Sequence, residues 1–263
     1  MARLVVMTSN HLRHKFFVNT LAARHEVAGV FCEAKRPLPA GGQGERHPVV
    51  QRHFSERTQA EQRYFGGHQE LRIGSGSVHA LAYGQANAPE TFEAVRALAP
   101  EFIVLFGTSI IRDPLLSHYQ GRIINLHLGL SPYYRGSGTN FWPLVNREPQ
   151  CVGATIHHAI LKVDAGDVLA QVRPRPEAAD RCHELGCKAI AAGAEIMAAV
   201  LERLEDGGLT ASPQEPGGRL YRGKDFHVEA VERMWRHFDT GMMEEYLAHK
   251  RDWDARFPLV ELA

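Results

Sequence analysis

The sequence has few cysteines, and their arrangement suggests neither a disulfide framework nor a metal site. Its 263 residues include only four, and none belongs to a CxxC pair. A chain of this length buries a sufficient hydrophobic core without disulfides, so we expect reduced thiols. Cys182, His183 and Cys187 are close in sequence, but their spacing fits no common zinc pattern, so no metal is predicted.

Long apolar runs and an excess of one charge are also missing. No stretch approaches the ~20 apolar residues of a membrane span. The apolar run at residues 4–7 is too short for the core of a signal peptide, which favours a cytoplasmic protein. The 30 basic and 30 acidic residues give a formal net charge of zero, so no overall field attracts nucleic acid or anionic lipid. We expect neither partner, and a homodimer is left open.

Short β-branched runs alternate with helical patterns along most of the chain. Such alternation implies a parallel sheet with right-handed crossovers. The predicted class is therefore α/β, a Rossmann-like, mostly parallel central sheet with helices on both faces. Strands are expected at residues 4–7, 27–31, 77–83, 102–106, 122–128, 152–159 and 168–172, and helices at 89–98, 110–118 and 182–204.

Two regions depart from this alternation. Residues 36–67 are polar and rich in Gly, Arg and Gln, which predicts a long loop that accommodates one short helix. Two shorter helices are expected after Gly223. We therefore predict a main catalytic domain over residues 1–210 and a short helical C-terminal extension, residues 211–263, packed on it.

The most informative strand has the sequence Ile-Ile-Asn-Leu-His-Leu at residues 123–128. Side chains alternate along a strand, so Asn125 and His127 should project from one face. The loop that follows is rich in glycine, and ligands in open α/β sheets bind beyond the carboxyl ends of strands. Asn-x-His alone is weak evidence, because polar residues on a strand more often have a structural role. A later loop, residues 161–167, adds the carboxylates of Asp164 and Asp167.

Taken together, these segments resemble the folate-dependent formyltransferase family, which includes the glycinamide ribonucleotide and methionyl-tRNA enzymes. The resemblance covers about a quarter of the chain closely, and its strength lies in the joint order and spacing of the motifs. These are Ser117-His118-Tyr119 with Gly121-Arg122, Asn125-Leu126-His127, Leu130-Ser131-Pro132 with Tyr134-Arg135-Gly136, Gly153-Ala154-Thr155 and Asp164-Ala165-Gly166-Asp167.

The resemblance implies that Asn125, His127 and Asp164 are the catalytic residues. Attack of an amine on a formyl carbon places charge on the carbonyl oxygen, which the Asn125 amide and the His127 imidazole can stabilise as donors. Asp164 would then orient His127 and accept the proton of the amine directly or through water.

The resemblance also implies the ligands. The formyl donor would be 10-formyltetrahydrofolate, and its pteridine would lie between two loops, largely against backbone groups. The implied cofactor-binding residues are Thr108, Ser109, Ile110, Ile111, Leu161 and Val163. For the acceptor, we predict contacts with Arg135, Gly136, Ser137 and His11, the last in a small basic cluster at the start of a helix.

The acceptor is predicted only as the amine of a small molecule. Residues 8–15 lack the glycine-rich turn that holds the ribonucleotide phosphate in the purine-pathway enzyme. The region after Leu204 is short for the C-terminal domain that the tRNA enzymes use. A nucleotide-linked amino sugar and a hydroxylamine-bearing amino acid are therefore the examples we favour.

Two other functions are compatible with the same sequence motifs. A formyltetrahydrofolate deformylase would use water as the nucleophile; those relatives carry an N-terminal regulatory domain, whereas the first strand here is predicted at Leu4. A non-catalytic folate-binding protein would not need the three catalytic residues together. Of the adjacent pair His157 and His158, only one can face the site, and the sequence does not say which.

Overall fold

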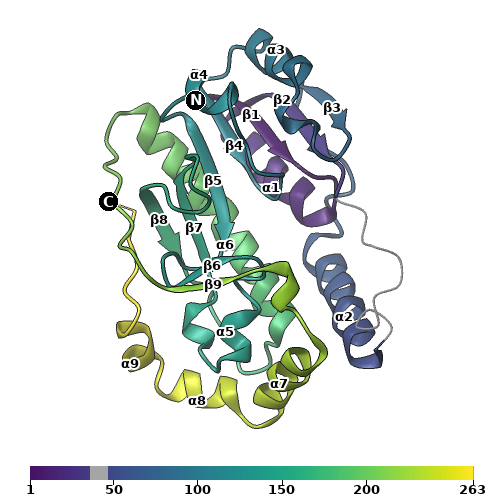
Figure 1. Ribbon diagram of the computed structural model, residues 1–263, viewed down its shortest axis with the longest axis vertical. Coiled ribbons are helices and arrows are strands. Elements are labelled where there is room, and N and C mark those ends of the chain that lie inside the picture. The colour runs from purple at the N-terminus through teal and green to yellow at the C-terminus, as the bar shows by residue number, and fades with distance from the viewer. Residues whose placement is uncertain (36–46, 263) are drawn as a thin grey trace.

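A seven-stranded sheet forms the centre of the protein in the computed structural model, which describes residues 1–35 and 47–262 (Figure 1). The strand order is β3-β2-β1-β4-β5-β7-β8. The first five strands in this order run parallel, and β7 is antiparallel to both of its neighbours. The strands are β1 (Arg3–Thr8), β2 (Glu26–Glu33), β3 (Ser77–Leu81), β4 (Phe102–Leu105), β5 (Ile123–Leu128), β7 (Ala154–His158) and β8 (Val168–Val172). The predicted Rossmann-like α/β class is confirmed.

Side chains that alternate along the strands pack into two separate cores, one on each face of the sheet. On β1, Leu4 and Val6 point into a core that includes the long helix α6 (Cys182–Glu205), while Val5 and Met7 point to the opposite face. Helix α1 (Leu12–Ala22) lies beside α6, and α2 (Pro48–Phe65) packs outside both. The opposite face is covered by the short helices α3 (Pro89–Ala97) and α4 (Leu115–His118). The central strands are therefore buried on both sides, as a parallel sheet requires.

A third apolar core lies at the carboxyl end of β5. It joins α5 (Trp142–Val145) to the C-terminal helices α7 (Val228–Asp239) and α8 (Met242–Ala248). A two-stranded parallel ribbon, β6 (Tyr134–Gly136) with β9 (Arg219–Tyr221), runs alongside. The remaining elements are η1 (Gln85–Asn87), η2 (Pro149–Cys151), η3 (Gly223–Asp225) and α9 (Lys250–Ala255). A helical C-terminal segment is thus present, with three α-helices after Gly223 where two were expected; the domain boundary at residue 210 stays a prediction.

Helix α2 corrects the prediction of a long loop with one short helix. It has 18 residues, and residues 36–46 lie outside the described part of the chain. The region is polar because most of the helix surface faces solvent. Its buried residues, Val50, His53, Ala60 and Phe65, form a narrow stripe that packs on α1, α6 and α7. Because one residue of that stripe is a histidine, the apolar periodicity of the sequence was too weak to predict the full length of the helix.

The predicted helix at residues 110–118 is also wrong, because only Leu115–His118 is helical. The side chain of Asn87 accepts from the Arg112 amide at 2.7 Å and donates to the Ile110 carbonyl at 2.9 Å. Pro114 further disfavours a helical conformation at the residue before it. Residues 110–113 therefore form a loop beyond β4.

None of the helices in the described ranges, 1–35 and 47–262, combines the length and apolar character needed to cross a membrane.

The glycine before β7 provides a test of the sheet packing. A Cβ on Gly153 would lie 2.4 Å from the Val172 carbonyl oxygen and 2.6 Å from Leu130 Cδ2. We expect Gly153→Ala to lower the free energy of unfolding by about 1–3 kcal/mol, because strand backbone must move. Urea unfolding measures this change. Gly186→Ala in α6, where a Cβ meets nothing within 4 Å, is the control and should be neutral or stabilising; equal effects would contradict the packing.

Candidate active site

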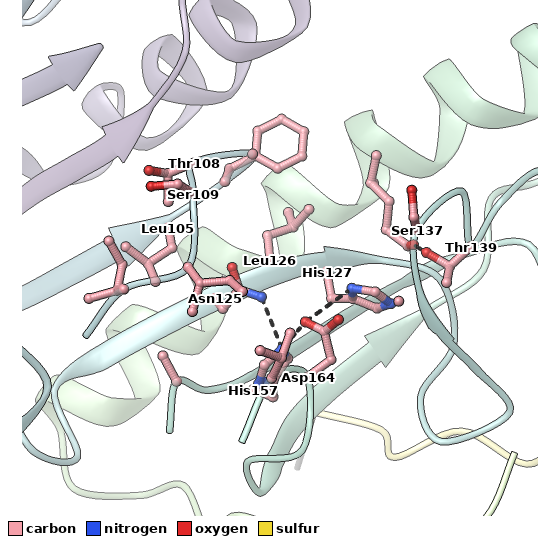
Figure 2. A pocket seen from close by; sticks show the side chains of 18 of the residues that line it. Leu105, Thr108, Ser109, Asn125, Leu126, His127, Ser137, Thr139, His157 and Asp164 are labelled. Carbon is pink, nitrogen blue, oxygen red and sulfur yellow. Dashed lines mark hydrogen bonds and ion pairs between the residues drawn. The ribbon is translucent and has the colours of Figure 1, made fainter. Parts of the chain in front are cut away.

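The site is built on the two strands where the sheet changes from parallel to antiparallel. In the register of β5 with β7, Asn125 lies opposite His157 and His127 lies opposite Thr155. Directly paired residues of antiparallel strands project from the same face. Ile124 and Leu126 point to the other face, into the core beneath α6. Four polar side chains are thereby gathered on one side of two strands, as Figure 2 shows for three of them.

His157 fixes the orientation of the Asn125 amide. The Nδ1 atom of His157 lies 2.8 Å from the His158 carbonyl oxygen, which can only accept, so Nδ1 carries the proton. Nε2 of the same ring then accepts from Asn125 Nδ2 at 3.0 Å. Burial, together with the nearby charge of His127, lowers the pKa of His157 to about 4, which keeps the ring neutral. The second N–H of the Asn125 amide stays available to the site.

Asp164 reaches His127 from the loop between β7 and β8. Its Oδ1 lies 3.4 Å from His127 Nδ1 and 3.8 Å from His157 Nε2. The expected proximity of Asp164 to His127 is therefore confirmed. Asp164 has a φ of 51°, a left-handed conformation that Asp tolerates better than most residues. The loop is held close to β7, since a Cβ on Gly166 would lie 1.9 Å from the His158 carbonyl oxygen.

Thr155 anchors the loop that follows β5. Its hydroxyl donates to the Gly129 carbonyl at 2.7 Å and accepts from the Ser131 amide at 3.0 Å. Asn140 adds a paired contact with the backbone of Gly153, at 2.9 and 3.0 Å. These bonds explain in physical terms why a threonine on β7 accompanies the loop motif after the Asn-x-His strand.

His127 is 7% exposed, and its Nε2 has no hydrogen-bond partner among the described residues. With Nδ1 directed at the Asp164 carboxylate, Nε2 is the atom left for a ligand. A buried polar atom without a partner costs free energy unless a bound group satisfies it. His127 Nε2 is therefore free to contact a bound ligand, while the Asp164 carboxylate lies on the other side of the ring.

Asn125, His127 and Asp164 line a cavity of about 670 Å³. Residues 105–111 form one wall, residues 136–141 another, and the loop after β7 a third. Of the residues predicted for folate, Thr108, Ser109, Ile110, Ile111 and Val163 line it. Gly136 and Ser137, predicted for the acceptor, line it too. In the described part of the chain, Leu161, Arg135 and His11 are not among the lining residues, so their contacts stay predictions.

A buried carboxylate holds the wall formed by residues 107–111. Glu33, at the end of β2, accepts from the Ser109 amide at 2.7 Å and from the hydroxyls of Thr108 and Ser109 at 3.1 and 2.9 Å. These hydroxyls are therefore occupied in shaping the loop. This role was not predictable from the sequence, because Glu33 is an isolated acid at the end of a strand.

Two cations that the site prediction did not include, Arg13 and Lys35, line the end of the cavity near Gly107. Lys35 donates to the Gly107 carbonyl. Burial lowers the pKa of Lys35, and the nearby charge of Arg13 lowers it further. His14 lies beside them, and burial together with the same two cations holds its pKa well below the usual range. This basic end of the cavity would gain from an anionic ligand group.

Comparison with known proteins agrees with this architecture. Residues 3–201 match the model of the family described as formyl transferase. A sugar N-formyltransferase from a Shewanella species superposes with a TM-score of 0.58 at 15% identity, covering 89% of this chain and 88% of that one. A 4-N formyltransferase from Francisella tularensis gives 0.55 at 14% identity, covering 89% and 86%. A phosphoribosylglycinamide formyltransferase from Bacillus halodurans gives 0.53 at 21% identity, covering 77% and 94%. At these identities the structural likeness establishes the fold.

The neutral state of His157 predicts a dependence of stability on pH. Its folded pKa of about 4 lies below the ordinary 6.5, so the unfolded chain binds the proton more readily. The free energy of unfolding should therefore fall as the pH drops from about 6.5 to about 4, by roughly 1–3 kcal/mol from this ring. Urea unfolding across this range measures the summed loss, to which His14, His53 and His183 also contribute because their pKa values are lowered too. An NMR titration in which the folded protein protonates His157 near pH 6.5 would contradict the assignment.

Proposed function

This chain belongs to the formyl transferase family, whose model matches residues 3–201, and we propose that it transfers a formyl group from 10-formyltetrahydrofolate to the amine of a small-molecule acceptor. One observation carries the proposal: the side chains of Asn125, His127 and Asp164 converge on one cavity beyond the parallel strands. This is where open α/β sheets bind ligands.

The acceptor nitrogen bonds to the formyl carbon of the bound donor, and the carbonyl oxygen carries the negative charge until the bond to the folate nitrogen breaks. The free N–H of Asn125 and Nε2–H of a protonated His127 stabilise the negative oxygen at that carbon. Asp164 holds the imidazolium through Nδ1 and receives the proton lost by the amine, directly or through water. His127 then gives its Nε2 proton to the departing nitrogen. Asp164 thus gains the proton that the amine loses, and His127 loses the proton that the folate nitrogen gains, so protons and charge balance.

The cavity has the chemistry to hold a flat, partly apolar donor. Ile110, Ile160 and Val163 line it and remain 50%, 47% and 50% exposed. Apolar side chains left open beside a polar site are typical of ligand pockets. With the residue 107–111 loop fixed by Glu33, backbone groups at this wall are preorganised for the pteridine ring.

The positive charges of Arg13 and Lys35 at the cavity favour an acceptor, or a donor tail, that carries negative charge. Arg13 is paired with the Glu61 carboxylate at 2.6 Å, whereas Lys35 donates to an uncharged carbonyl, so an anionic group near Lys35 would provide it with an opposite charge. A phosphate of a nucleotide-linked amino sugar has the required charge, and so has the carboxylate of a hydroxylamine-bearing amino acid.

The proposal is tested by incubating the protein with 10-formyltetrahydrofolate and a panel of amines while following tetrahydrofolate release. Acceptor-dependent release, with a formylated product detected by mass spectrometry, is expected. Release at the same rate without any amine would identify a hydrolase instead, and binding without release would identify a folate-binding protein.

We expect Asp164→Asn to reduce turnover by ~100-fold or more while folate affinity stays nearly unchanged, because the charge that supports His127 is lost. Asn tolerates the left-handed backbone, so the loop should keep its shape. Asp167→Asn is the matched control, since this second carboxylate of the loop is exposed and does not line the cavity. Normal turnover in Asp164→Asn would refute the mechanism.

We further expect Lys35→Ala to raise the KM of the anionic substrate by ~10-fold or more, with a smaller effect on kcat, because only binding uses this charge. Steady-state kinetics with each substrate varied in turn will show which substrate is affected. Lys15→Ala is the control, because its Nζ donates to the exposed Gln69 carbonyl at 2.6 Å, away from the cavity. Arg135→Ala, measured in parallel, tests the acceptor contact predicted from sequence. Unchanged KM values in Lys35→Ala would rule out the anion contact.

A further inference from the structure

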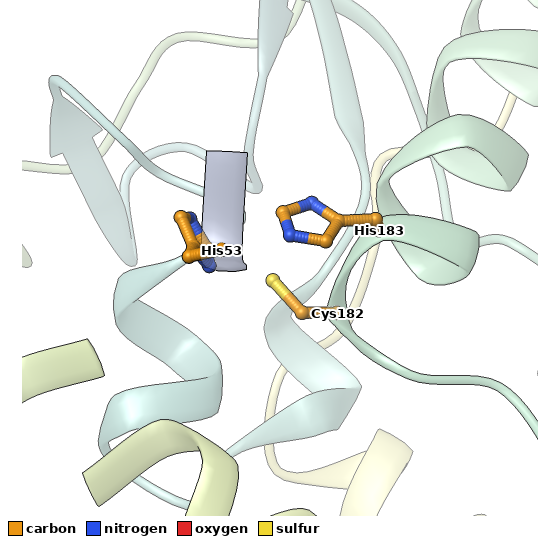
Figure 3. Close-up of side chains that lie close together, drawn as sticks. All are labelled: His53, Cys182 and His183. Atoms are coloured by element: carbon orange, nitrogen blue, oxygen red, sulfur yellow. The ribbon is translucent and has the colours of Figure 1, made fainter. Parts of the chain in front are cut away.

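A second group of reactive side chains lies between helices α2 and α6, outside the cavity. His53 comes from α2, and Cys182 and His183 are the first two residues of α6 (Figure 3). One ring nitrogen from each histidine and the cysteine sulfur all lie within 4.8 Å of one another. The three residues are 5%, 7% and 7% exposed.

Hydrogen bonds within the protein do not account for this group. His53 Nδ1 and His183 Nε2 are both buried without a partner among the described residues. An imidazole nitrogen that carries no proton and has no hydrogen-bond partner can offer its lone pair to a bound group. The rings of Phe141, Phe226 and Trp235 surround His53, with centroids 5.5, 6.1 and 6.2 Å away. Buried, unpaired nitrogens in an apolar shell are costly, and a bound group would satisfy them.

We propose that His53, Cys182 and His183 bind one zinc-class divalent transition-metal ion that ties α2 to the start of α6. Two imidazoles and a thiolate are ligands that such ions prefer, whereas magnesium and calcium take oxygen ligands. With bonds of about 2.0–2.3 Å, the ligand atoms around a tetrahedral ion lie about 3.4–3.7 Å apart. Small side-chain rotations that move the ligand atoms by about 1 Å complete that geometry. On binding, the Cys182 thiol releases its proton to solvent, and water completes the coordination.

Cys187 does not belong to the site, although the sequence places it near Cys182. It lies more than one turn further along α6, and the third ligand is instead His53, from a region predicted as a long loop with only one short helix. The spacing of Cys182, His183 and Cys187 therefore could not reveal this group.

Arg57 brings a positive charge close to both histidines. Its Nε lies 3.9 Å from Glu61 Oε1, and its guanidinium stacks on Phe54 at 4.9 Å. The thiolate cancels one charge of the metal, and Glu61, which also accepts from Arg13, offsets only part of the charge of Arg57. We therefore expect Arg57→Gln to tighten metal binding.

The test is spectroscopic and does not depend on formyl transfer. Tag-free protein is treated with a chelator and titrated with Co²⁺, which should bind at about one equivalent and give a thiolate charge-transfer band in the near ultraviolet with the visible bands of a tetrahedral site. Zn²⁺ should displace the Co²⁺ and raise the thermal unfolding midpoint. The band requires a sulfur ligand, so it separates this site from weak binding by the other histidines.

Cys182→Ala should abolish the charge-transfer band and weaken Zn²⁺ binding by ~100-fold or more. Cys187→Ala and Cys151→Ala, which also remove buried thiols, are the matched controls and should keep the band. His53→Asn should weaken binding while Cys182 remains, and circular dichroism confirms folding of each variant. Wild-type protein that binds Co²⁺ without the band, or not at all at micromolar concentration, overturns the proposal. A band that survives in Cys182→Ala does so as well.

Discussion

The antiparallel pairing of β7 with β5 is the constraint on which the site depends. It places His157 opposite Asn125 and Thr155 opposite His127, so each residue of the Asn-x-His strand has a defined neighbour. His157 sets the Asn125 amide, and Thr155 anchors the backbone where β5 ends. The antiparallel pairing of β7 with β8 then allows the short connection between them, residues 159–167, to bring Asp164 to His127. Two antiparallel pairings of β7 therefore supply the geometry of all three candidate catalytic residues.

Much of the sheet could be predicted from sequence, because buried parallel strands are continuous apolar runs. Residues 102–106 were identifiable on that basis, and the alternation along the predicted strand 122–128 placed Asn125 and His127 on one face. The choice between His157 and His158 could not be made, because alternation does not say which face of a strand looks into a cavity. The structure gives that place to His157, which lines the cavity and contacts Asn125.

The errors have a common physical origin in tertiary contacts. Residues 110–113 could have continued a helix, but Asn87 satisfies their backbone groups from another part of the chain. Lys35 and Glu33 sit at the end of β2, and only the sheet order brings them beside the residues that follow β4. Neither residue belongs to a local motif. The strand with the candidate catalytic residues was therefore predictable from the sequence, but the residues that shape and charge the cavity around it were not.

Helix α2 contacts residues at two ends of the cavity. At the basic end of the cavity, its Glu61 accepts from Arg13 at 2.6 Å, with both side chains largely buried. At the other end, its His53 packs against Phe141, a residue of the cavity wall, with centroids 5.5 Å apart. An ion that fixed His53 to α6 would thus also restrain Phe141 and, through the rigid helix, the partner of Arg13. The proposed metal would then act on substrate binding through position alone, without touching the reacting atoms.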